Sequence, residues 1–266
     1  MLIGGNLIEL DLSSHRALVL GASQGIGRSI AEQLAAAGCN VTLTARTEDS
    51  LFQITKSLPG KDHKFFAGDH SDLSQFMSQV DEQIQHNGNF DIVVFNSGGP
   101  PAGKMSEARS KDFMEPMARH LGLASEIVGR TVDHMKDKKY GRYVAVTSTS
   151  VKIPIPHLGV SNTVRAAMAS YLKTLSLELA PFGITVNNLM PGFTETPRLE
   201  SLMEGAANKQ GKSVEEIRKA WIGQVPAGRF AQPNELAYLA TFLCSDFGGY
   251  ITGQNIPVDG GRLGCL

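Results

Sequence analysis

The stretch Gly21-Ala22-Ser23-Gln24-Gly25-Ile26-Gly27 is the clearest indication of the fold of this chain. It follows the apolar run 17–20, typical of a buried strand, and leads into the amphipathic segment 26–37, typical of a helix. A glycine-rich turn in this context lets the backbone approach a pyrophosphate and leaves helix N-terminal amides pointing at the anion. The spacing is Gly-x-x-x-Gly-x-Gly and not the more common Gly-x-Gly-x-x-Gly. We therefore expect a dinucleotide-binding turn with these ligand-facing residues: Gly21, Ser23, Gly25, Ile26 and Gly27.

The rest of the chain alternates short β-type runs with longer amphipathic segments. Further strands are predicted at 41–44, 63–66, 90–95, 143–147, 184–189 and 256–258, and further helices at 48–58, 73–85, 111–136, 162–180 and 233–244. This alternation predicts a single domain (1–266) of the α/β class, a Rossmann-type doubly wound parallel sheet of about seven strands with helices on both faces. The segment 197–225 breaks the regular spacing. We expect it to form a helical insertion that covers the site as a lid, because ligands of open α/β sheets bind beyond the carboxyl ends of the strands.

Composition excludes several functional classes. The 266 residues are 42% hydrophobic and 19% charged, and the formal net charge of −1 gives no indication of nucleic acid or an anionic membrane as a partner. Three widely spaced cysteines, Cys39, Cys244 and Cys265, argue against a disulfide framework and against a metal site. Residues 1–12 lack the features of a signal peptide, and no stretch approaches 18 apolar residues. We expect a soluble, cytoplasmic protein.

Five motifs, each at the end of a predicted strand, give the chain a family resemblance. They are the turn 21–27, Asp69, Asn96-Ser97-Gly98-Gly99, Ser148 with Pro191-Gly192-Phe193-Thr194-Glu195-Thr196 farther on, and Pro257-Val258-Asp259-Gly260-Gly261. With these motifs the chain resembles the short-chain dehydrogenase/reductase family over nearly its whole length. The resemblance implies a nicotinamide dinucleotide as cofactor and a homo-oligomer, a tetramer or a dimer.

The resemblance also implies roles for single residues. Asp69 would accept a hydrogen bond from the adenine amino group, and Asn96 and Gly98 would line the adenine–ribose side. Three residues would border the nicotinamide: Pro191, Gly192 and Thr194.

The choice of cofactor depends on the end of the second predicted strand. A carboxylate there would bind the ribose hydroxyls and repel a 2′-phosphate. This chain has Thr44-Ala45-Arg46, and the Arg46 guanidinium can pair with a phosphate through two parallel hydrogen bonds. NADP(H) is therefore favoured over NAD(H). Gln24 argues against this choice, because many NADP-dependent relatives carry a second basic residue at that position.

The catalytic positions depart from the family pattern. The family uses a Tyr, a Lys four residues later, a Ser thirteen residues before the Tyr, and an Asn on the preceding long helix. Here Ser148 is kept, but Ser161 stands at the Tyr position, Arg165 at the Lys position and His120 at the Asn position. The Tyr-x-x-x-Lys pair is therefore missing.

These substitutions change the available chemistry. The aliphatic hydroxyl of Ser161 is a much weaker acid than a phenol. Arg165 stays protonated, so it can hold ribose hydroxyls and stabilise negative charge but cannot pass protons. His120 has an ordinary pKa of about 6.5, which suits a proton relay, and His157 is a second candidate for that role.

Three functions fit this pattern. The first is an NADP(H)-dependent oxidoreductase that interconverts a carbonyl and an alcohol, of the 3-oxoacyl reductase or small carbonyl reductase type, with a non-standard proton donor. The second is a catalytically inactive NADP(H)-binding homologue that acts as a sensor or structural subunit. The third is non-redox chemistry like that of halohydrin dehalogenases, which also place Arg at the Lys position but keep the Tyr and abandon the glycine turn. The enoyl-reductase branch is disfavoured, because it needs a Tyr where Leu158 stands.

The sequence says little about the substrate beyond its being a small molecule. Apolar side chains in the expected lid suit an apolar or acyl substrate, although they would serve equally well as packing within the lid. They are Leu199, Leu202, Met203, Ile217 and Trp221.

Overall fold

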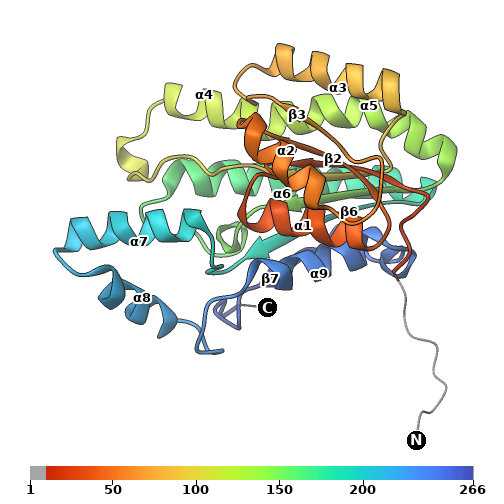
Figure 1. Cartoon of the computed structure of the whole chain (residues 1–266). Coiled ribbons are helices and arrows are strands. Elements are labelled where there is room, and N and C mark those ends of the chain that lie inside the picture. Colours follow the sequence, from red (N-terminus) through yellow and green to blue (C-terminus); the bar gives the residue numbers. More distant parts are fainter. Residues whose placement is uncertain (1–9, 266) are drawn as a thin grey trace, which may run out of the picture.

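The computed structural model describes residues 10–265, which form one seven-stranded parallel sheet (Figure 1). The strands lie in the order β3-β2-β1-β4-β5-β6-β7. Their bounds are β1 (Arg16–Leu20), β2 (Asn40–Ala45), β3 (Lys64–Ala67), β4 (Ile92–Asn96), β5 (Gly141–Val146), β6 (Ile184–Pro191) and β7 (Asn255–Val258). The predicted doubly wound sheet is confirmed.

Helices cover both faces of the sheet. One face carries α1 (Gly25–Ala36), α2 (Glu48–Ser57) and α9 (Pro233–Cys244); the other carries α3 (Leu73–Asn87), α4 (Lys111–Met117), α5 (Leu123–Lys138) and α6 (Gly159–Leu179). Successive side chains of a strand point to opposite faces, so β1 places Ala17 and Val19 in the first core and Leu18 and Leu20 in the second. The five central strands are buried on both sides, which explains their continuous apolar character, whereas the edge strands β3 and β7 are only partly buried.

The strand order reverses between β1 and β4, where Val19 is paired with Val94. The chain winds outward in one direction from β1 to β3 and in the other from β4 to β7, so the connections after β1 and β4 diverge. Such a switch point leaves a crevice at the carboxyl ends of the strands, the usual ligand site of open α/β sheets. The glycine turn follows β1 directly and therefore lies at this crevice.

The predicted single helix 111–136 is wrong in one respect. A π-helical turn, Ala118–Gly122, separates α4 from α5, and α5 continues to Lys138. Pro116 lies inside α4 and has no backbone N–H to donate, and the helix passes into the wider π geometry directly after α4. The turn matters for the site, because it carries Arg119 and His120.

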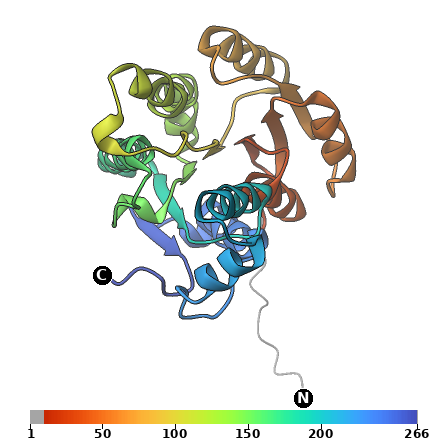
Figure 2. The same ribbon diagram turned by 90° about the vertical axis from the view of Figure 1, so that its left-hand side faces the viewer.

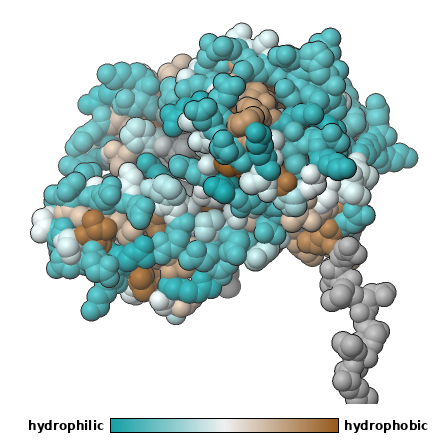
Figure 3. All heavy atoms as spheres, in the orientation of Figure 1, coloured by the Kyte–Doolittle hydropathy of each residue, from teal (hydrophilic) through white to brown (hydrophobic). Residues whose placement is uncertain are grey.

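The segment expected to form a lid contains two helices, α7 (Pro197–Gln210) and α8 (Val214–Ile222). They share a small separate core with Phe230, and Trp221 stacks on Phe193 at 4.9 Å. Seen from the carboxyl edge, α7 and α8 lie in front of the strands (Figure 2). Figure 3 shows a largely hydrophilic face with scattered apolar patches, one of them over these helices. Closure of this segment over a ligand stays a prediction.

A buried carboxylate ties the opposite, amino-terminal edge of the sheet together. Asp91 accepts hydrogen bonds from the backbone N–H of Arg16 and from His134 Nε2, each at 2.9 Å. Lys138 Nζ lies 2.9 Å and His15 Nδ1 3.7 Å from the same carboxylate. Burial acts to raise the pKa of Asp91, but these neighbours outweigh it and hold the pKa well below its usual range.

The prediction for the N-terminal segment, that it is no signal peptide, lies mostly outside the described residues. Within residues 10–265, none of the helices combines the length and apolar character needed to cross a bilayer. Cys39 and Cys244 are buried thiols, and Cys265 is exposed.

Candidate active site

The glycine turn is held by close backbone contacts that exclude any side chain. A Cβ added to Gly27 would lie 2.4 Å from Asn96 Nδ2, and one added to Gly21, whose φ is +62°, would lie 2.6 Å from the Asn96 carbonyl oxygen. The Asn96 amide donates to the carbonyl oxygens of Leu20 (3.2 Å) and Gly21 (3.1 Å). Asn96 therefore fastens the end of β4 to the turn, while its contact with an adenosine ribose stays a prediction.

The N-terminus of α1 fits an anion. Its capping residue, Gln24, makes no side-chain capping bond, and the first turn of α1 contains no acidic residue. The first amides of the helix, from Gly25 to Gly27, therefore keep their donors for a ligand, with the half-buried Ser23 beside them. A pyrophosphate fits the N-terminus of α1, because the free amides carry partial positive charge and the glycines leave space for the phosphate groups.

Asp69 and Arg46 are the residues predicted for the adenosine side. Asp69 is exposed, and the backbone N–H of Ser71 donates to its Oδ1 at 2.9 Å, which lowers the pKa of the carboxyl. Arg46 is exposed at the end of β2, and no acid among residues 10–265 pairs with it. This free guanidinium lies where the sequence predicts a 2′-phosphate.

Ser148 follows β5 and opens a short 3₁₀ turn, Thr149–Val151. Its Oγ accepts the backbone N–H of Ser150 at 3.1 Å. The hydroxyl hydrogen is not used by this bond, so Ser148 can donate it to the oxygen of a ligand.

Ser161 and Arg165 lie on α6, which begins three residues earlier than predicted and so brings Ser161 into its first turn. A Cβ placed on Gly99 would lie 3.8 Å from Ser161 Oγ and 3.6 Å from Arg165 Nη2. Both side chains therefore lie close to Gly99, at distances that would be ordinary contacts for a Cβ at that position.

The Arg165 guanidinium is buried, with 7% of the residue exposed. Nη1 donates to the carbonyl oxygen of Val146 (2.9 Å) and Nη2 to that of Ser97 (3.2 Å), so the side chain bridges the carboxyl ends of β4 and β5. No carboxylate of residues 10–265 pairs with it. Burial, with a smaller contribution from the charge of Arg198, lowers the pKa of Arg165 to about 10, so it remains a cation at neutral pH.

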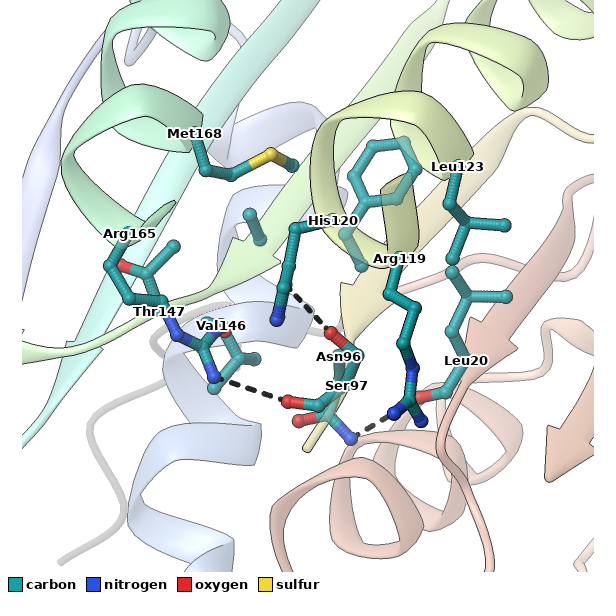
Figure 4. A pocket seen from close by; sticks show the side chains of 12 residues that line it. Leu20, Asn96, Ser97, Arg119, His120, Leu123, Val146, Thr147, Arg165 and Met168 are labelled. Carbon is teal, nitrogen blue, oxygen red and sulfur yellow. Dashed lines mark hydrogen bonds between the residues drawn. The ribbon is translucent and has the colours of Figure 1, made fainter. Parts of the chain in front are cut away.

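His120 lies on the π-helical turn and points into the pocket between Arg165 and Arg119 (Figure 4). Its Nδ1 lies 2.9 Å from Ser97 Oγ, in hydrogen-bonding contact. Burial lowers the pKa of His120 to about 3, and the charges of Arg165 and Arg119 act in the same direction. The imidazole is therefore neutral near pH 7.

Ser97 was not among the site residues predicted from the sequence. The signal that could have indicated it is a pair of departures from the family pattern: a serine after β4, where the family usually has Asn, and a histidine at the Asn position of the long helix. The two residues are 23 positions apart, and the π-helical turn brings them together.

The residues predicted for the nicotinamide side lie where β6 ends, at Pro191. A Cβ on Gly192 would lie 2.6 Å from Asp259 Cα, so the chain passes too close there for any side chain. Thr194 is buried, and its Oγ1 donates to the Gly192 carbonyl oxygen at 3.3 Å. Thr196 caps α7, and its Cγ2 would lie 3.1 Å from a Cβ on Gly25, so the start of α7 borders the glycine turn.

The structure thus brings Ser97, His120 and Arg165 into one pocket, and both Arg165 and Ser161 lie near Gly99. His157 is not brought there. It is exposed, adopts a left-handed backbone conformation with φ of 62°, and its carbonyl oxygen accepts the N–H of Gly103 at 2.7 Å.

Comparisons with known proteins find similar sequences and folds along nearly the whole chain. Residues 21–262 match the family described as "Enoyl-(Acyl carrier protein) reductase". The granaticin polyketide synthase putative ketoacyl reductase 1 of Streptomyces violaceoruber is 34% identical over 251 residues, which cover 92% of each chain. The NADPH-dependent reductase BacG of Bacillus subtilis is 28% identical over 95% of this chain and 99% of the relative. The crystal structure of L-sorbose reductase from Gluconobacter frateurii, complexed with NADPH and L-sorbose, superposes with a TM-score of 0.90 at 27% identity, covering 97% of this chain and all of the other.

Proposed function

Because this chain belongs to the short-chain dehydrogenase/reductase family of oxidoreductases, we propose that it uses NADP(H) to interconvert a carbonyl compound and an alcohol without a tyrosine–lysine pair. The observation that carries this proposal is the partly buried hydrogen-bonding contact between Ser97 and His120, beside Arg165 at the carboxyl ends of β4 and β5. It supports a proton relay that does not need a phenol at position 161.

The residues present fit NADP(H). The first turn of α1 would hold the pyrophosphate, and the unpaired Arg46 would hold the 2′-phosphate. BacG and the sorbose reductase, two of the similar proteins, are described with NADPH, which supports the same choice here. Asp69, Gly98, Gly192 and Thr194 remain the residues we propose for the adenine and nicotinamide ends.

The chain's own residues would prepare the carbonyl for reduction. NADPH, when bound, supplies the hydride. The Ser148 hydroxyl donates a hydrogen bond to the carbonyl oxygen, and Ser161 offers a second hydroxyl in the space beside Gly99. Arg165 stabilises the negative charge that develops on that oxygen, because a buried cation acts there through a low dielectric.

The proton would come through Ser97 and His120. A neutral imidazole can give up a proton from one ring nitrogen while it takes one at the other, so it relays protons without becoming a stable cation. Such a relay suits a ring whose pKa is lowered to about 3, because it needs no imidazolium in the resting protein.

One observation favours the alternative of an inactive NADP(H)-binding homologue. The Arg165 guanidinium already donates to two backbone carbonyls, which is a structural use of the side chain. If that were its whole role, the site would bind the cofactor and perform no reduction.

Two measurements separate these functions. Titration of NADPH fluorescence with the protein tests binding, and the absorbance of NADPH, followed with a panel of ketones, aldehydes and oxo acids, tests turnover. Saturable binding followed by oxidation supports the reductase. Binding without oxidation of NADPH by any member of the panel supports the inactive homologue, and no binding contradicts both.

We also propose that the protein is a homo-oligomer. Leu177 on α6, and Phe247 and Tyr250 shortly before β7, are large side chains left exposed in the single chain, which supports this proposal. Light scattering on the purified protein tests this: a monomer at micromolar concentration contradicts it.

A further inference from the structure

The loop between β6 and α7 carries side chains that point in two opposite directions. Thr194 forms a parallel β-bridge with Ala231, closed by bonds from Glu195 N–H to the Ala231 carbonyl and from Ala231 N–H to the Phe193 carbonyl, each 2.9 Å long. Successive side chains alternate in such backbone, so Phe193 and Glu195 point to one side and Thr194 to the other. Thr194 is buried, and it is the residue predicted to lie near the nicotinamide.

The two side chains that flank Thr194 are held by α8. Glu195 accepts two hydrogen bonds from the Arg218 guanidinium, from Nη1 at 2.7 Å and from Nη2 at 2.9 Å. Trp221 stacks on Phe193, with the ring centroids 4.9 Å apart. Arg218 and Trp221 are three positions apart and therefore lie on one face of α8. A single face of this helix thus fixes the loop on both sides of Thr194.

Further contacts extend this layer to the C-terminal segment. The Arg262 guanidinium lies over the Phe193 ring, 4.3 Å from its centroid, and its Nη2 donates to Gln224 Oε1 at 3.4 Å, shortly after α8. The Arg218 guanidinium lies over the Phe230 ring, 5.2 Å from its centroid. Aromatic rings and guanidinium groups therefore support the β6–α7 loop on the side that faces away from Thr194.

The ion pair in this layer has a defined geometry. The exposed fractions are 30% for the Arg218 side chain and 31% for that of Glu195, so the pair is partly shielded from water. Among residues 10–265, no other group donates a hydrogen bond to the Glu195 carboxylate. A two-fold guanidinium–carboxylate bond fixes orientation as well as distance. Loss of Arg218 would therefore release this part of the loop.

We propose that Arg218 is a positioning residue: through Glu195 it holds the β6–α7 loop in the conformation that receives the nicotinamide end of NADP(H). This inference rests on the proposed function, and it gives α8 a role separate from covering a substrate. The phosphates have their own partners in the α1 amides and Arg46. Arg218 therefore affects the affinity for the nicotinamide and not the affinity for the rest of the cofactor.

The test compares NADPH with 2′-phospho-ADP-ribose, which keeps the adenosine and the phosphates but lacks the nicotinamide. Calorimetric titration of the full-length protein gives the Kd of each compound. Arg218→Gln should raise the Kd of NADPH about three- to tenfold, the range expected for the loss of one partly shielded ion pair, and leave that of 2′-phospho-ADP-ribose unchanged. A general disturbance of the fold would weaken both compounds to the same extent.

Further variants separate the ion pair from other effects. Glu195→Gln should match Arg218→Gln, and the double variant should add no further loss, because both changes remove the same contact. Arg218→Lys, which keeps the charge and one of the two bonds, should recover part of the affinity for NADPH. Arg130→Gln is the matched control: its guanidinium makes a similar two-fold bond with Asp81, at 2.6 and 3.2 Å, between α5 and α3. It should change neither Kd.

The positioning role is overturned if Arg218→Gln weakens both compounds equally or changes neither Kd. It is also overturned if the wild type binds NADPH no more tightly than 2′-phospho-ADP-ribose. Failure of the proposed function looks different. If the wild type binds neither compound, no cofactor is there to position and both proposals fall. If it shows the expected Kd values but never oxidises NADPH, the reductase is excluded and the positioning role stands.

Discussion

Replacing His120 with asparagine tests the proposed proton relay. Asparagine keeps a carbonyl oxygen that can accept the Ser97 hydroxyl, now held by Nδ1 at 2.9 Å, but it cannot carry a proton between two nitrogens. General acid–base groups contribute about 10²- to 10⁴-fold to rates. A ring with a pKa near 3 is a weak base, so we expect a loss at the lower end of this range. The loss should be about hundredfold in kcat, which corresponds to an activation free energy higher by about 2.7 kcal/mol. The Kd of NADPH should not change.

The pH dependence of kcat/KM and of stability tests the protonation state of His120 independently. Because burial and the nearby arginines keep His120 neutral, the kcat/KM profile should have no inflection near pH 6.5 that depends on this residue. The unfolded chain binds a proton below about pH 6.5 while the folded protein does not. His120 therefore lowers the free energy of unfolding by about 1.4 kcal/mol for each pH unit below 6.5, until the folded pKa is reached. Urea unfolding of wild type and variant at pH 7.5 and 5.5 measures this.

The proposed relay through a neutral His120 is refuted if kcat is unchanged in His120→Asn. It is also refuted if the kcat/KM profile of the wild type shows an inflection near pH 6.5 that the variant lacks. His86→Asn, an exposed histidine in the last turn of α3, is the matched control and should match the wild type in both assays.

Three further predictions concern the glycine turn, the choice of cofactor and the stability of the fold. Gly27→Ala places a Cβ 2.4 Å from backbone and amide atoms, so it should cost about 1–3 kcal/mol in chemical denaturation and weaken NADPH at least tenfold by fluorescence titration; unchanged affinity would contradict the close approach. Arg46→Gln should raise the Kd of NADPH about tenfold and leave that of NADH unchanged, whereas equal losses would count against a 2′-phosphate contact. Asp91→Asn should lower the free energy of unfolding by about 3 kcal/mol at pH 7. Burial acts to raise the pKa of Asp91, but His15 and Lys138 lower it in the fold, so that difference should begin to shrink as the pH falls below about 4. A difference as large at pH 3 as at pH 7 would contradict the assignment.

The glycine turn and the sheet could be predicted because their signals are local. The turn between β1 and α1 needs glycine where Gly21 and Gly27 meet Asn96, and strand and helix periodicities can be read from short windows. The end of β5 then places Ser148 at one edge of the sheet, and α6 brings the Arg165 side chain to the same edge.

The remaining features depend on three-dimensional contacts that a sequence does not display. The π-helical turn follows a helix that contains Pro116. The position of His120 next to Ser97 depends on this turn and could not be predicted without it. Whether Arg165 has a counter-ion depends on every acid that the fold brings near it. The ordinary pKa of a histidine was likewise the wrong starting point for His120, because its burial could not be read from its neighbours in sequence.

The proposed reductase activity is tested most simply by the number of NADPH molecules that one protein molecule oxidises in the presence of oxo compounds. We expect saturable binding of NADPH and repeated turnover, carried out with serine at position 161 and arginine at position 165. A protein that binds NADPH tightly but oxidises none of it, with any oxo compound offered, would contradict it.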